Sequence, residues 1–508
     1  MTRLLKKPRH YKEAHRQNII NLSLIAPSSM LHNFKFFIDD LDMITFNNLN
    51  QKLIDAEYAV RGKIVTRAQE LEKAGKKITY CNIGNPHAFA QKPLSYVREV
   101  LSLLEFPDLL ERDLTNLFHS DSIERARYIL RQIPEGVGAY SASAGVEFVR
   151  EAVAKFIATR DNIPTNHDRI ILTDGASKAA QSVIAAIIKN QNDGLMVPVP
   201  QYPMYSAALT LAGGQSIGYY LDEENHWQLN EESLVDSYNT ARLNKLNPVA
   251  VTVINPGNPT GAVLSYENIK MIINFARQHN LAILADEVYQ ENIYNKAGKF
   301  HSFAKVMHDM QVSDVSLFSF HSMSKGFYGE CGHRSGYLEV RNVPDDVFEQ
   351  FVKFQSINLC ANVVGQIATY LMVSPPQQND ASYSLYIQER SAILEDLKEK
   401  AHILGDELNK IEGISVNIPE GAMYAFVKLN FPPAKLNPSL GATVDERYCM
   451  ALLEDTGLCV IPGSGFGQLP NTWHFRTTFL PPRNQIVALV AQLAQFHKKY
   501  VAQLSTNA

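Results

Sequence analysis

Short apolar runs alternate with amphipathic segments through the middle of the chain, and this alternation constrains the fold more than any other feature. Segments of helical period, such as 177–189 and 265–279, lie between the apolar runs. Strands that are buried on both faces read as continuous apolar runs, and parallel strands need long crossovers. The sequence therefore predicts an α/β fold with a mostly parallel sheet flanked by helices, and the expected strands are 169–173, 194–199, 249–254, 281–285, 315–320 and 337–340.

The pattern changes after the two prolines at 375 and 376. Beyond them a long helix is expected over 383–411, followed by strands at 413–417, 422–428 and 458–461 and a terminal helix over 484–503. Strands and helices without strict alternation are typical of an α+β domain. We predict an N-terminal arm over 1–55, a large domain over 111–385, and a smaller domain built from 56–110 and 386–508.

Composition excludes several classes of protein. The 508 residues are 45% hydrophobic and 20% charged, with a net charge of −4, so no global attraction to nucleic acid or to an anionic membrane is expected. No apolar run reaches the roughly 20 residues of a membrane span. The five cysteines contain no C-x-x-C pair, and no metal-binding motif is present, so we expect neither a metal nor a disulfide framework.

The N-terminus is strongly basic. Residues 1–35 hold one acidic residue, Glu13, against seven cationic residues: Arg3, Lys6, Lys7, Arg9, Lys12, Arg16 and Lys35. This bias is similar to that of a mitochondrial transit peptide, although a basic arm is the plainer interpretation. We therefore expect the cytoplasm, with the mitochondrial matrix as the alternative.

Polar motifs follow five of the expected strands. They occupy 174–177, 200–203, 255–261, 286–289 and 322–325. In open α/β sheets the ligand binds at the carboxyl ends of the strands. The five motifs therefore predict one binding site at this edge of the sheet.

The motif at 322–325 indicates the chemistry of that site. Ser322 and Lys325 lie at a strand end, and Arg334 follows Lys325 by nine residues. Pyridoxal phosphate needs this combination, because it is held through an amine and requires fixed positive charge for its phosphate. The alternative S-x-x-K motif of serine acyltransferases also requires S-D-N and K-T-G, and neither tripeptide occurs. If this motif is taken alone, the alternative that Lys325 is a solvated lysine at a strand end is not excluded.

The other strand ends offer matching groups. Residues 175–177 open a helix and can bind an anion or simply cap the helix. Asp286 can pair with a pyridinium N–H or cap a helix. Asn258 and Tyr289 can donate to the ring oxygen, although turn chemistry alone explains Asn258. Tyr202 can stack on a ring or fill a core.

Arg476 lies among apolar neighbours near the C-terminus. Its planar guanidinium suits bidentate binding of an α-carboxylate, and an exposed arginine at a strand edge is the alternative. The glycine-rich turn at 463–467 lacks the spacing of a serine-hydrolase elbow. We expect its backbone to approach the substrate.

These motifs resemble those of the fold-type I pyridoxal-phosphate aminotransferases, and in particular the alanine aminotransferase branch. The resemblance runs from about 56 to 496, through 58–62, 138–143, 201–205, 255–261, 285–289, 321–337, 462–467 and 474–476. The insertion at 329–332 is similar to that branch in particular. One departure is the loop at 83–87, where an acidic residue commonly follows Gly84.

The resemblance implies a role for each matching residue. Lys325 becomes the Schiff-base lysine, Asp286 the partner of the pyridine nitrogen, and Tyr202 the stacking ring. The donors to the ring oxygen become Asn258 and Tyr289, and the phosphate ligands become Ala176, Ser177, Ser322 and Arg334.

For the substrate, the resemblance implies an α-carboxylate clamp at Arg476 and a loop around Gly84 that approaches the ligand. Tyr140 would reach the phosphate of a neighbouring subunit, which implies a homodimer. A site that accepts a methyl and a carboxyethyl side chain in turn needs a flexible or switchable cation. Arg61 is a candidate for it, although the sequence does not place Arg61 in the site.

The implied activity is reversible transamination between L-alanine and 2-oxoglutarate, giving pyruvate and L-glutamate. The alternatives are another fold-type I activity, such as 1-aminocyclopropane-1-carboxylate synthase or an aromatic aminotransferase, and a pyridoxal-binding transcription regulator. About 55 residues precede the resemblance, which is short for the helix-turn-helix module and linker that a regulator needs.

Overall fold

A computed structural model describes residues 44, 46–294, 299–431 and 443–506. The expectation of a basic or targeting arm over 1–35 lies outside the described residues. The chain divides into two compact units, Met1–Asp55 and Ala56–Ala508. In the first unit, the 3-10 helix η1 spans Phe46–Asn48 and α3 spans Gln51–Asp55. Everything that follows concerns the second unit.

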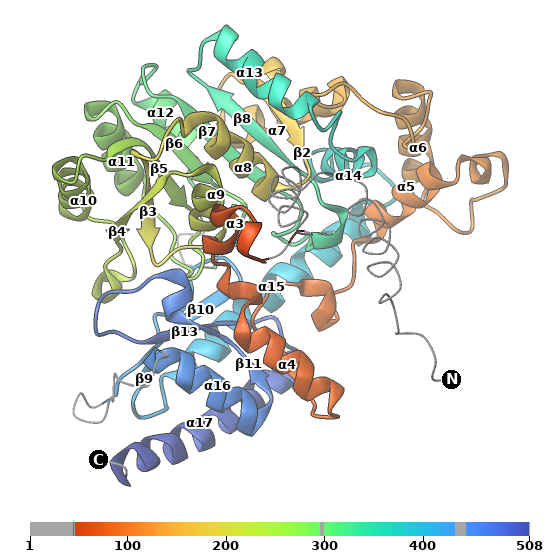
Figure 1. Cartoon of the computed structure of the whole chain (residues 1–508). Coiled ribbons are helices and arrows are strands. Elements are labelled where there is room, and N and C mark those ends of the chain that lie inside the picture. Colours follow the sequence, from red (N-terminus) through yellow and green to blue (C-terminus); the bar gives the residue numbers. More distant parts are fainter. Residues whose placement is uncertain (1–43, 45, 295–298, 432–442, 507–508) are drawn as a thin grey trace, which may run out of the picture. The chain divides into compact units, whose positions relative to one another are not determined.

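A seven-stranded sheet forms the centre of the second unit (Figure 1). The strands lie across the sheet in the order β2 (Ile170–Thr173), β8 (Gly336–Arg341), β7 (Leu317–Ser322), β6 (Ala282–Asp286), β5 (Asn247–Ile254), β3 (Asp193–Val199) and β4 (Gln215–Tyr220). Strands β7, β6, β5, β3 and β4 are parallel, whereas β8 runs antiparallel to both of its neighbours. The predicted mostly parallel sheet is confirmed, and β8 departs from the parallel direction.

The edge strand β4 was missed by the sequence pattern. It begins with two exposed polar residues, Gln215 and Ser216, and only alternate positions are buried further along. Because β4 is exposed at several of its positions, its sequence lacks the continuous apolar run of strands that are buried on both faces.

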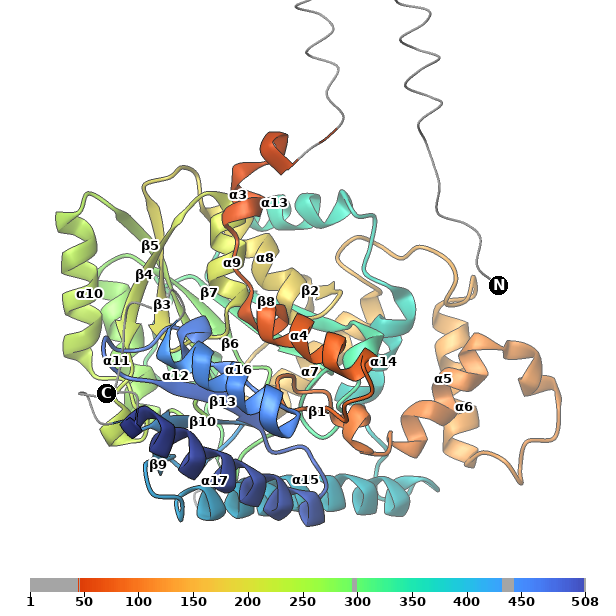
Figure 2. The ribbon, with the colours of Figure 1, turned by 60° about the horizontal axis from the view of Figure 1, so that its bottom comes forward.

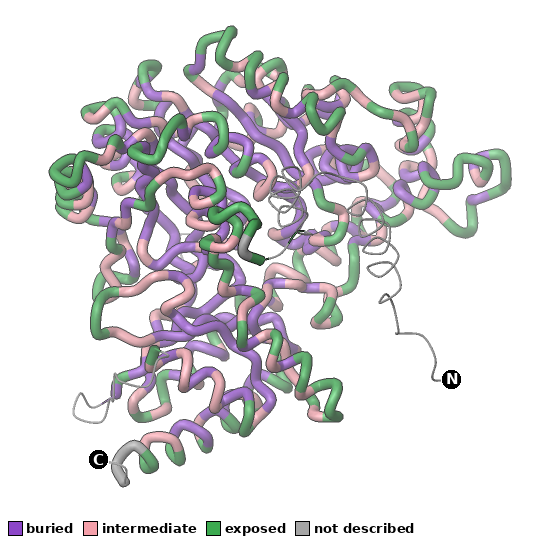
Figure 3. The backbone as a smooth tube through the Cα atoms, in the orientation of Figure 1, coloured by how far each residue is buried: buried purple, intermediate pink, exposed green. Residues whose placement is uncertain are grey.

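Helices cover both faces of this sheet, because successive side chains of each strand point to opposite faces. Leu195, Val197 and Leu284 pack with α8 (Ala176–Ile187), α9 (Met204–Ala212) and α13 (Asp345–Ser356). The intervening residues Met196 and Ile283 pack with α10 (Glu231–Leu243), α11 (Tyr266–Gln278) and α12 (Phe303–Asp309). The strands β2, β6 and β7 are accordingly buried along almost their whole length, as Figure 3 shows for the centre of the sheet.

A third apolar cluster lies at the β2 edge of the sheet. It joins β2 and β8 to α5 (Ser95–Glu105), α6 (Ser120–Gln132), α7 (Glu147–Asp161) and α14 (Val363–Val373). No helix in the described ranges is both long enough and apolar enough to cross a bilayer.

The C-terminal part of the chain builds an antiparallel sheet of four strands. Their order is β12 (Ile461–Pro462), β13 (His474–Thr478), β10 (Tyr424–Leu429) and β9 (Ile414–Ser415). This sheet packs with α4 (Lys63–Lys73), α15 (Tyr383–Leu408), α16 (Val444–Thr456) and α17 (Arg483–Thr506). Helices α15 and α17 lie side by side (Figure 2).

A two-stranded parallel pairing connects the two ends of this unit. Strand β1 (Thr79–Tyr80) pairs with β11 (Leu458–Cys459). The next residue after β1 stays attached to the four-stranded sheet, because Cys81 O accepts a hydrogen bond from Thr478 N at 3.0 Å. The loop 82–87 is thereby held close to β13. The predicted division into a large and a small domain at 110 and 385 stays a prediction.

Candidate functional site

A cleft of about 850 Å³ opens at the carboxyl ends of the parallel strands. The motifs after β2, β3, β5, β6 and β7 meet there, together with Tyr424 of β10 and Arg476 of β13. The predicted site residues that line this cleft are Gly84, Ala176, Ser177, Tyr202, Asn258, Asp286, Tyr289, Ser322, Lys325, Arg334 and Arg476. The strand ends of the open sheet supply most of these residues, as expected, whereas Arg476 comes from β13 and Gly84 from the loop after β1.

One corner of the cleft is suited to an anion. Helix α8 begins there behind Gly175, which has φ of 88° and supplies no side-chain cap. The Arg334 guanidinium lies so close that a Cβ on residue 175 would be 2.8 Å from its Nη2. Arg334 Nη2 also donates to the Asp174 carbonyl at 3.2 Å. An uncapped helix N-terminus beside a guanidinium attracts a phosphate group.

Asp286 ends β6 and lies on the floor of the cleft, with 5% of its surface exposed. Burial raises the pKa of its carboxyl to about 6, although a hydrogen bond from the Tyr205 hydroxyl, at 2.8 Å from Oδ2, opposes the rise. Among the described residues no cation forms an ion pair with it. A positively charged hydrogen-bond donor of a ligand would stabilise a buried carboxylate of this kind.

Lys325 lies across the cleft from the loop that carries Gly84. Its Nζ donates to the Gly84 carbonyl at 2.9 Å and stands 5.9 Å from the centre of the Tyr289 ring. Gly84 is required at its position, because a Cβ there would lie 2.4 Å from the Tyr424 hydroxyl and 3.2 Å from Lys325 Nζ. Among the described residues, the uncharged Gly84 carbonyl is therefore the hydrogen-bond acceptor of this amine.

Arg476 is 1% exposed, so the interpretation as an exposed arginine at a strand edge is wrong. Its guanidinium carbon lies 4.0 Å from the centre of the Tyr424 ring and 4.6 Å from that of Phe466. Nη1 donates to Asn258 Oδ1 at 3.0 Å, Nη2 donates to the Asn82 carbonyl, and Nε has no partner. No carboxylate in the described part of the chain pairs with this buried cation, so an anionic ligand has a place here.

Two residues of the site were missed by sequence reasoning. Tyr205 donates to Asp286, and Tyr424 accepts a hydrogen bond from Gly84 N at 3.0 Å. Burial raises the pKa of Tyr424, but the charges of Lys325 and Arg476 outweigh that effect, and the pKa is lowered overall. The one available signal was the position of Tyr205 in the motif region after β3, three residues beyond Tyr202 and in the first turn of α9.

Two predictions concern residues that do not line the cleft. Tyr140 is 79% exposed and does not line this cleft, so its expected role toward a neighbour stays a prediction. The turn at 463–467 does not reach the cleft. A Cβ on Gly465 would lie 2.3 Å from the Ala59 side chain, so this turn approaches the segment before α4, and its Phe466 ring supports Arg476.

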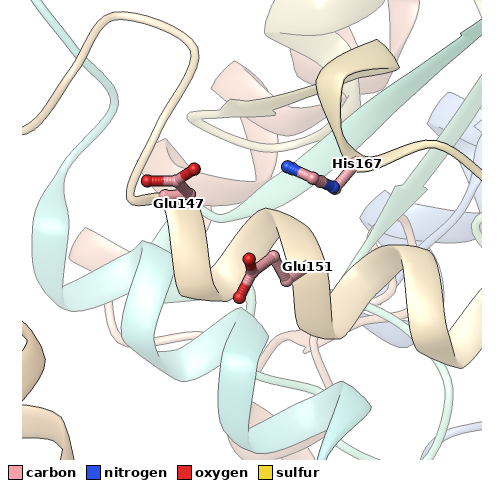
Figure 4. A group of neighbouring side chains, drawn as sticks. All are labelled: Glu147, Glu151 and His167. Atoms are coloured by element: carbon pink, nitrogen blue, oxygen red, sulfur yellow. The ribbon is translucent and has the colours of Figure 1, made fainter.

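One group of potential metal ligands lies outside the cleft. Glu147 and Glu151 on α7 and His167 have ligand atoms within 4.8 Å of one another (Figure 4). Both carboxylates are exposed, and none of the three residues lines the cleft. Exposed acidic groups commonly gather without a metal, so no role is assigned to them.

Comparisons with known proteins agree with this geometry. Residues 118–493 match the family "Aminotransferase class I and II". A "Probable alanine aminotransferase, mitochondrial" of Dictyostelium discoideum is 45% identical over 477 residues, covering 90% of this chain and 89% of the relative. A "Glutamate--glyoxylate aminotransferase 2" of Arabidopsis thaliana is 42% identical, covering 92% of this chain and 98% of the relative.

Solved structures show the same relationship. The structure of an alanine aminotransferase from Pyrococcus furiosus superimposes with a TM-score of 0.73 and 26% identity, over 89% of this chain and 100% of that chain. The chain therefore belongs to the class I and II aminotransferases. It is a pyridoxal-phosphate-dependent transaminase, and the anion corner, the buried Asp286 carboxylate and the Lys325 amine fit that cofactor.

The raised pKa of Asp286 predicts a pH-dependent stability difference in cofactor-free protein. The native carboxyl binds a proton up to about pH 6, whereas the unfolded one releases it near its usual value of 3.8. Between about pH 4 and 6 the native state thus holds more protons, and the contribution of Asp286 to stability falls as pH rises. The stability of Asp286→Asn relative to the wild type should therefore increase by about 3 kcal/mol through this window, whatever the difference is at low pH.

Denaturation with urea between pH 4.5 and 8 measures this difference. Asp314→Asn, which changes a carboxylate in a half-exposed pair with Arg277, serves as the control and should show no such trend. A constant difference between Asp286→Asn and wild type across the pH range would show that the carboxylate is not penalised by burial.

Proposed function

We propose that this chain catalyses the reversible transfer of the amino group of L-alanine to 2-oxoglutarate, giving pyruvate and L-glutamate. The observation that carries the proposal is the buried guanidinium of Arg476, which has no carboxylate partner among the described residues. Arg476 packs on the ring of Tyr424, and the charges of Arg476 and Lys325 both lower the pKa of that tyrosine. Amino acids and 2-oxoacids have one anionic group in common, the α-carboxylate. A planar cation beside a reactive amine is suited to bind that group and orient the neighbouring carbon.

The cofactor, when bound, supplies the carbonyl carbon that takes up the amino group and a ring that accepts electrons. In our proposal, the phosphate is held by Ala176, Ser177, Ser322 and Arg334, and the ring nitrogen is paired with Asp286. The donors to the ring oxygen are Tyr289 and the amide NH₂ of Asn258, whose Oδ1 is already occupied by Arg476. Tyr202, whose hydroxyl contacts that of Tyr58 at 2.7 Å, covers the ring.

Lys325 has two tasks in this proposal. Its Nζ first holds the cofactor. With the cofactor held by the other residues of the site, Nζ would accept the proton from the substrate Cα and donate it again later in the transfer. The hydrogen bond to the Gly84 carbonyl supports this second task, because it gives the released amine a fixed position at the cleft wall.

The name of the Dictyostelium relative supports the alanine side of the reaction, and the Arabidopsis relative supports the glutamate side with glyoxylate as an acceptor. We propose the cytoplasm as the compartment. The mitochondrial matrix is the alternative, which the name of the Dictyostelium relative and the basic residues of 1–35 support. Subcellular fractionation with compartment markers distinguishes the two.

The half-reactions test the function directly. The protein loaded with pyridoxal phosphate should change its visible absorbance on addition of alanine or glutamate, and pyruvate or 2-oxoglutarate should restore it. Lys325→Ala should abolish turnover, because the base at the cleft wall is lost. A change with tyrosine or phenylalanine but not with alanine would favour an aromatic aminotransferase. Elimination from S-adenosylmethionine would favour a 1-aminocyclopropane-1-carboxylate synthase. If glyoxylate accepted the amino group faster than pyruvate, glyoxylate would replace pyruvate in the proposal.

Arg476→Lys tests the α-carboxylate clamp. Lysine keeps the charge but loses the bidentate geometry, so kcat/KM should fall by about 2–4 kcal/mol, roughly 30- to 1000-fold. The loss should be similar for alanine and glutamate, which present the same α-carboxylate, and cofactor absorbance should survive. Arg483→Lys, which changes an arginine of an exposed ion pair with Asp396, should leave both substrates unaffected. A loss confined to glutamate would make Arg476 a side-chain reader instead.

We also propose a homodimer in which Tyr140 of each subunit contacts the phosphate bound by the other. The exposure of this large side chain in the single subunit supports the proposal. Tyr140→Phe should weaken cofactor binding about 2- to 10-fold, the contribution of one hydrogen bond, without changing the dimer seen in sedimentation. The control Tyr128→Phe, a partly exposed tyrosine on α6, should bind normally. A fully active monomer in sedimentation would refute the dimer.

A further inference from the structure

A second cavity lies at the edge of the seven-stranded sheet, between β4 and α10 (Figure 1). Its volume is about 620 Å³, which is within the range of roughly 300–1,000 Å³ that ligand pockets occupy. None of its lining residues lines the cleft, so it has no part in the reaction proposed above. The residues that matter in this β4 groove are Ser216, Gly218 and Tyr220 of β4 and Glu232, Ser233 and Asp236 of α10.

The backbone of β4 is paired with another strand on one side only, where β3 is its partner. In a parallel pair, the N–H and C=O groups of alternate residues point to the partner strand, and those of the intervening residues point away. Leu221 N donates to the Val199 carbonyl of β3 at 3.0 Å. Tyr220 faces the opposite way, because its N donates to Ser233 Oγ at 2.8 Å and its carbonyl accepts from that hydroxyl at 2.9 Å. The even-numbered residues of β4 therefore face away from β3.

Two further residues of β4 have the same orientation as Tyr220. They are Ser216 and Gly218, and among the described residues no group on the open side of β4 hydrogen-bonds to their backbone. Proteins commonly protect such an edge with a charged side chain, a proline, a bulge or a covering segment. The six residues of β4 include neither a charge nor a proline, and Ser233 covers the edge at Tyr220. The edge at 216–218 is therefore available to pair with an extended chain.

The side of the β4 groove that α10 forms is acidic. Glu232 and Asp236 are both exposed, and neither forms an ion pair in the described part of the chain. They are four residues apart on the helix, so their negative charges are neighbours and repel each other. The helix dipole stabilises Glu232 in the first turn, but this effect does not extend to Asp236 in the second turn. No cationic side chain is found among the lining residues, so a cation from a partner would relieve the repulsion.

We propose that the β4 groove binds an extended, basic segment of a partner protein, which adds to the sheet as a further strand. The backbone of this segment pairs with the open N–H and C=O groups of Ser216 and Gly218, and its cationic side chains lie against Glu232 and Asp236. A second copy of this chain is the less suitable occupant. Two β4 edges in contact would bring the acidic residues of both grooves together, and like charges across a strand pair are destabilising.

A synthetic peptide tests this proposal on the cofactor-loaded protein. The probe is a fluorescent peptide of about eight residues in which lysine and valine alternate, long enough to form one strand. Fluorescence anisotropy should show saturable binding that weakens as the salt concentration is raised. The same peptide with glutamate in place of lysine should not bind. A version that is N-methylated at every residue keeps its charges but has no N–H groups to pair, and it should not bind either.

Variants of α10 test the acidic side of the groove. Glu232→Gln combined with Asp236→Asn should weaken binding of the lysine peptide about 2- to 30-fold, the effect of two exposed ion pairs. The control is Glu231→Gln, which changes an exposed acid of the same helix that does not line the groove, and it should bind as the wild type does.

Variants of β4 test the strand pairing. Ser216→Pro removes an N–H on the open side and puts a ring in its place, so binding should weaken about 10-fold or more. Proline is tolerated in an edge strand when its nitrogen faces away from the sheet, so the pairing with β3 should persist. Ser216→Ala keeps the N–H and should bind normally. Unfolding in urea shows whether Ser216→Pro has kept its fold, and if it has not, the N-methylated peptide decides the question on the wild type.

Four results would overturn the proposal. Absence of binding of the lysine peptide to the wild type would remove the docking surface. Equal binding of the N-methylated peptide would show that the groove attracts charge without adding a strand. An equal loss in Glu231→Gln would reduce the effect to long-range attraction. Self-association in sedimentation that Ser216→Pro abolishes would assign the edge to a second copy of this chain. None of these readouts depends on turnover, so failure of the proposed reaction is distinguished from failure of this proposal.

Discussion

The structure depends on the burial of the Asp286 carboxylate at the end of β6. The parallel strands are buried on both faces, so a charge at their carboxyl ends is removed from water, and its pKa rises to about 6. Tyr205 supplies one hydrogen bond, but no cation among the described residues completes the pairing. The remaining strand ends are arranged around this unpaired charge, with an amine at Lys325 and an anion corner at the start of α8.

The four-stranded sheet contributes the opposite charge. Arg476 is buried between the rings of Tyr424 and Phe466, and its partners are the side chain of Asn258 and the backbone of Asn82. The pairing of β1 with β11 keeps the loop at 82–87 beside this strand. The cleft thus has a buried carboxylate from one sheet and a buried guanidinium from the other. A site of this kind is preorganised, because its charges are oriented before the ligand arrives.

Much of this could be predicted from the sequence, because strand ends in an open sheet converge and the motifs at 174–177, 255–261, 286–289 and 322–325 are polar in otherwise apolar surroundings. The rest depends on tertiary packing. Strand β13 reads His-Phe-Arg-Thr-Thr at 474–478, and this sequence is compatible both with a buried clamp and with an exposed arginine at a strand edge. Tyr424 reaches Gly84 across more than 300 residues of sequence, and no local signal marks such a contact. The antiparallel direction of β8 and the presence of β4 at the edge likewise depend on pairing with neighbouring strands of the sheet.

The central claim is that Asp286 keeps the ring nitrogen of bound pyridoxal phosphate protonated. Nitrogen-15 NMR of the enzyme loaded with ring-labelled cofactor measures that proton directly. At pH 8 the wild type should show the chemical shift of a protonated ring nitrogen, whereas Asp286→Asn, which cannot stabilise the charge, should show that of a neutral one. An unprotonated ring nitrogen in the wild type, or identical shifts in the two proteins, would contradict the account.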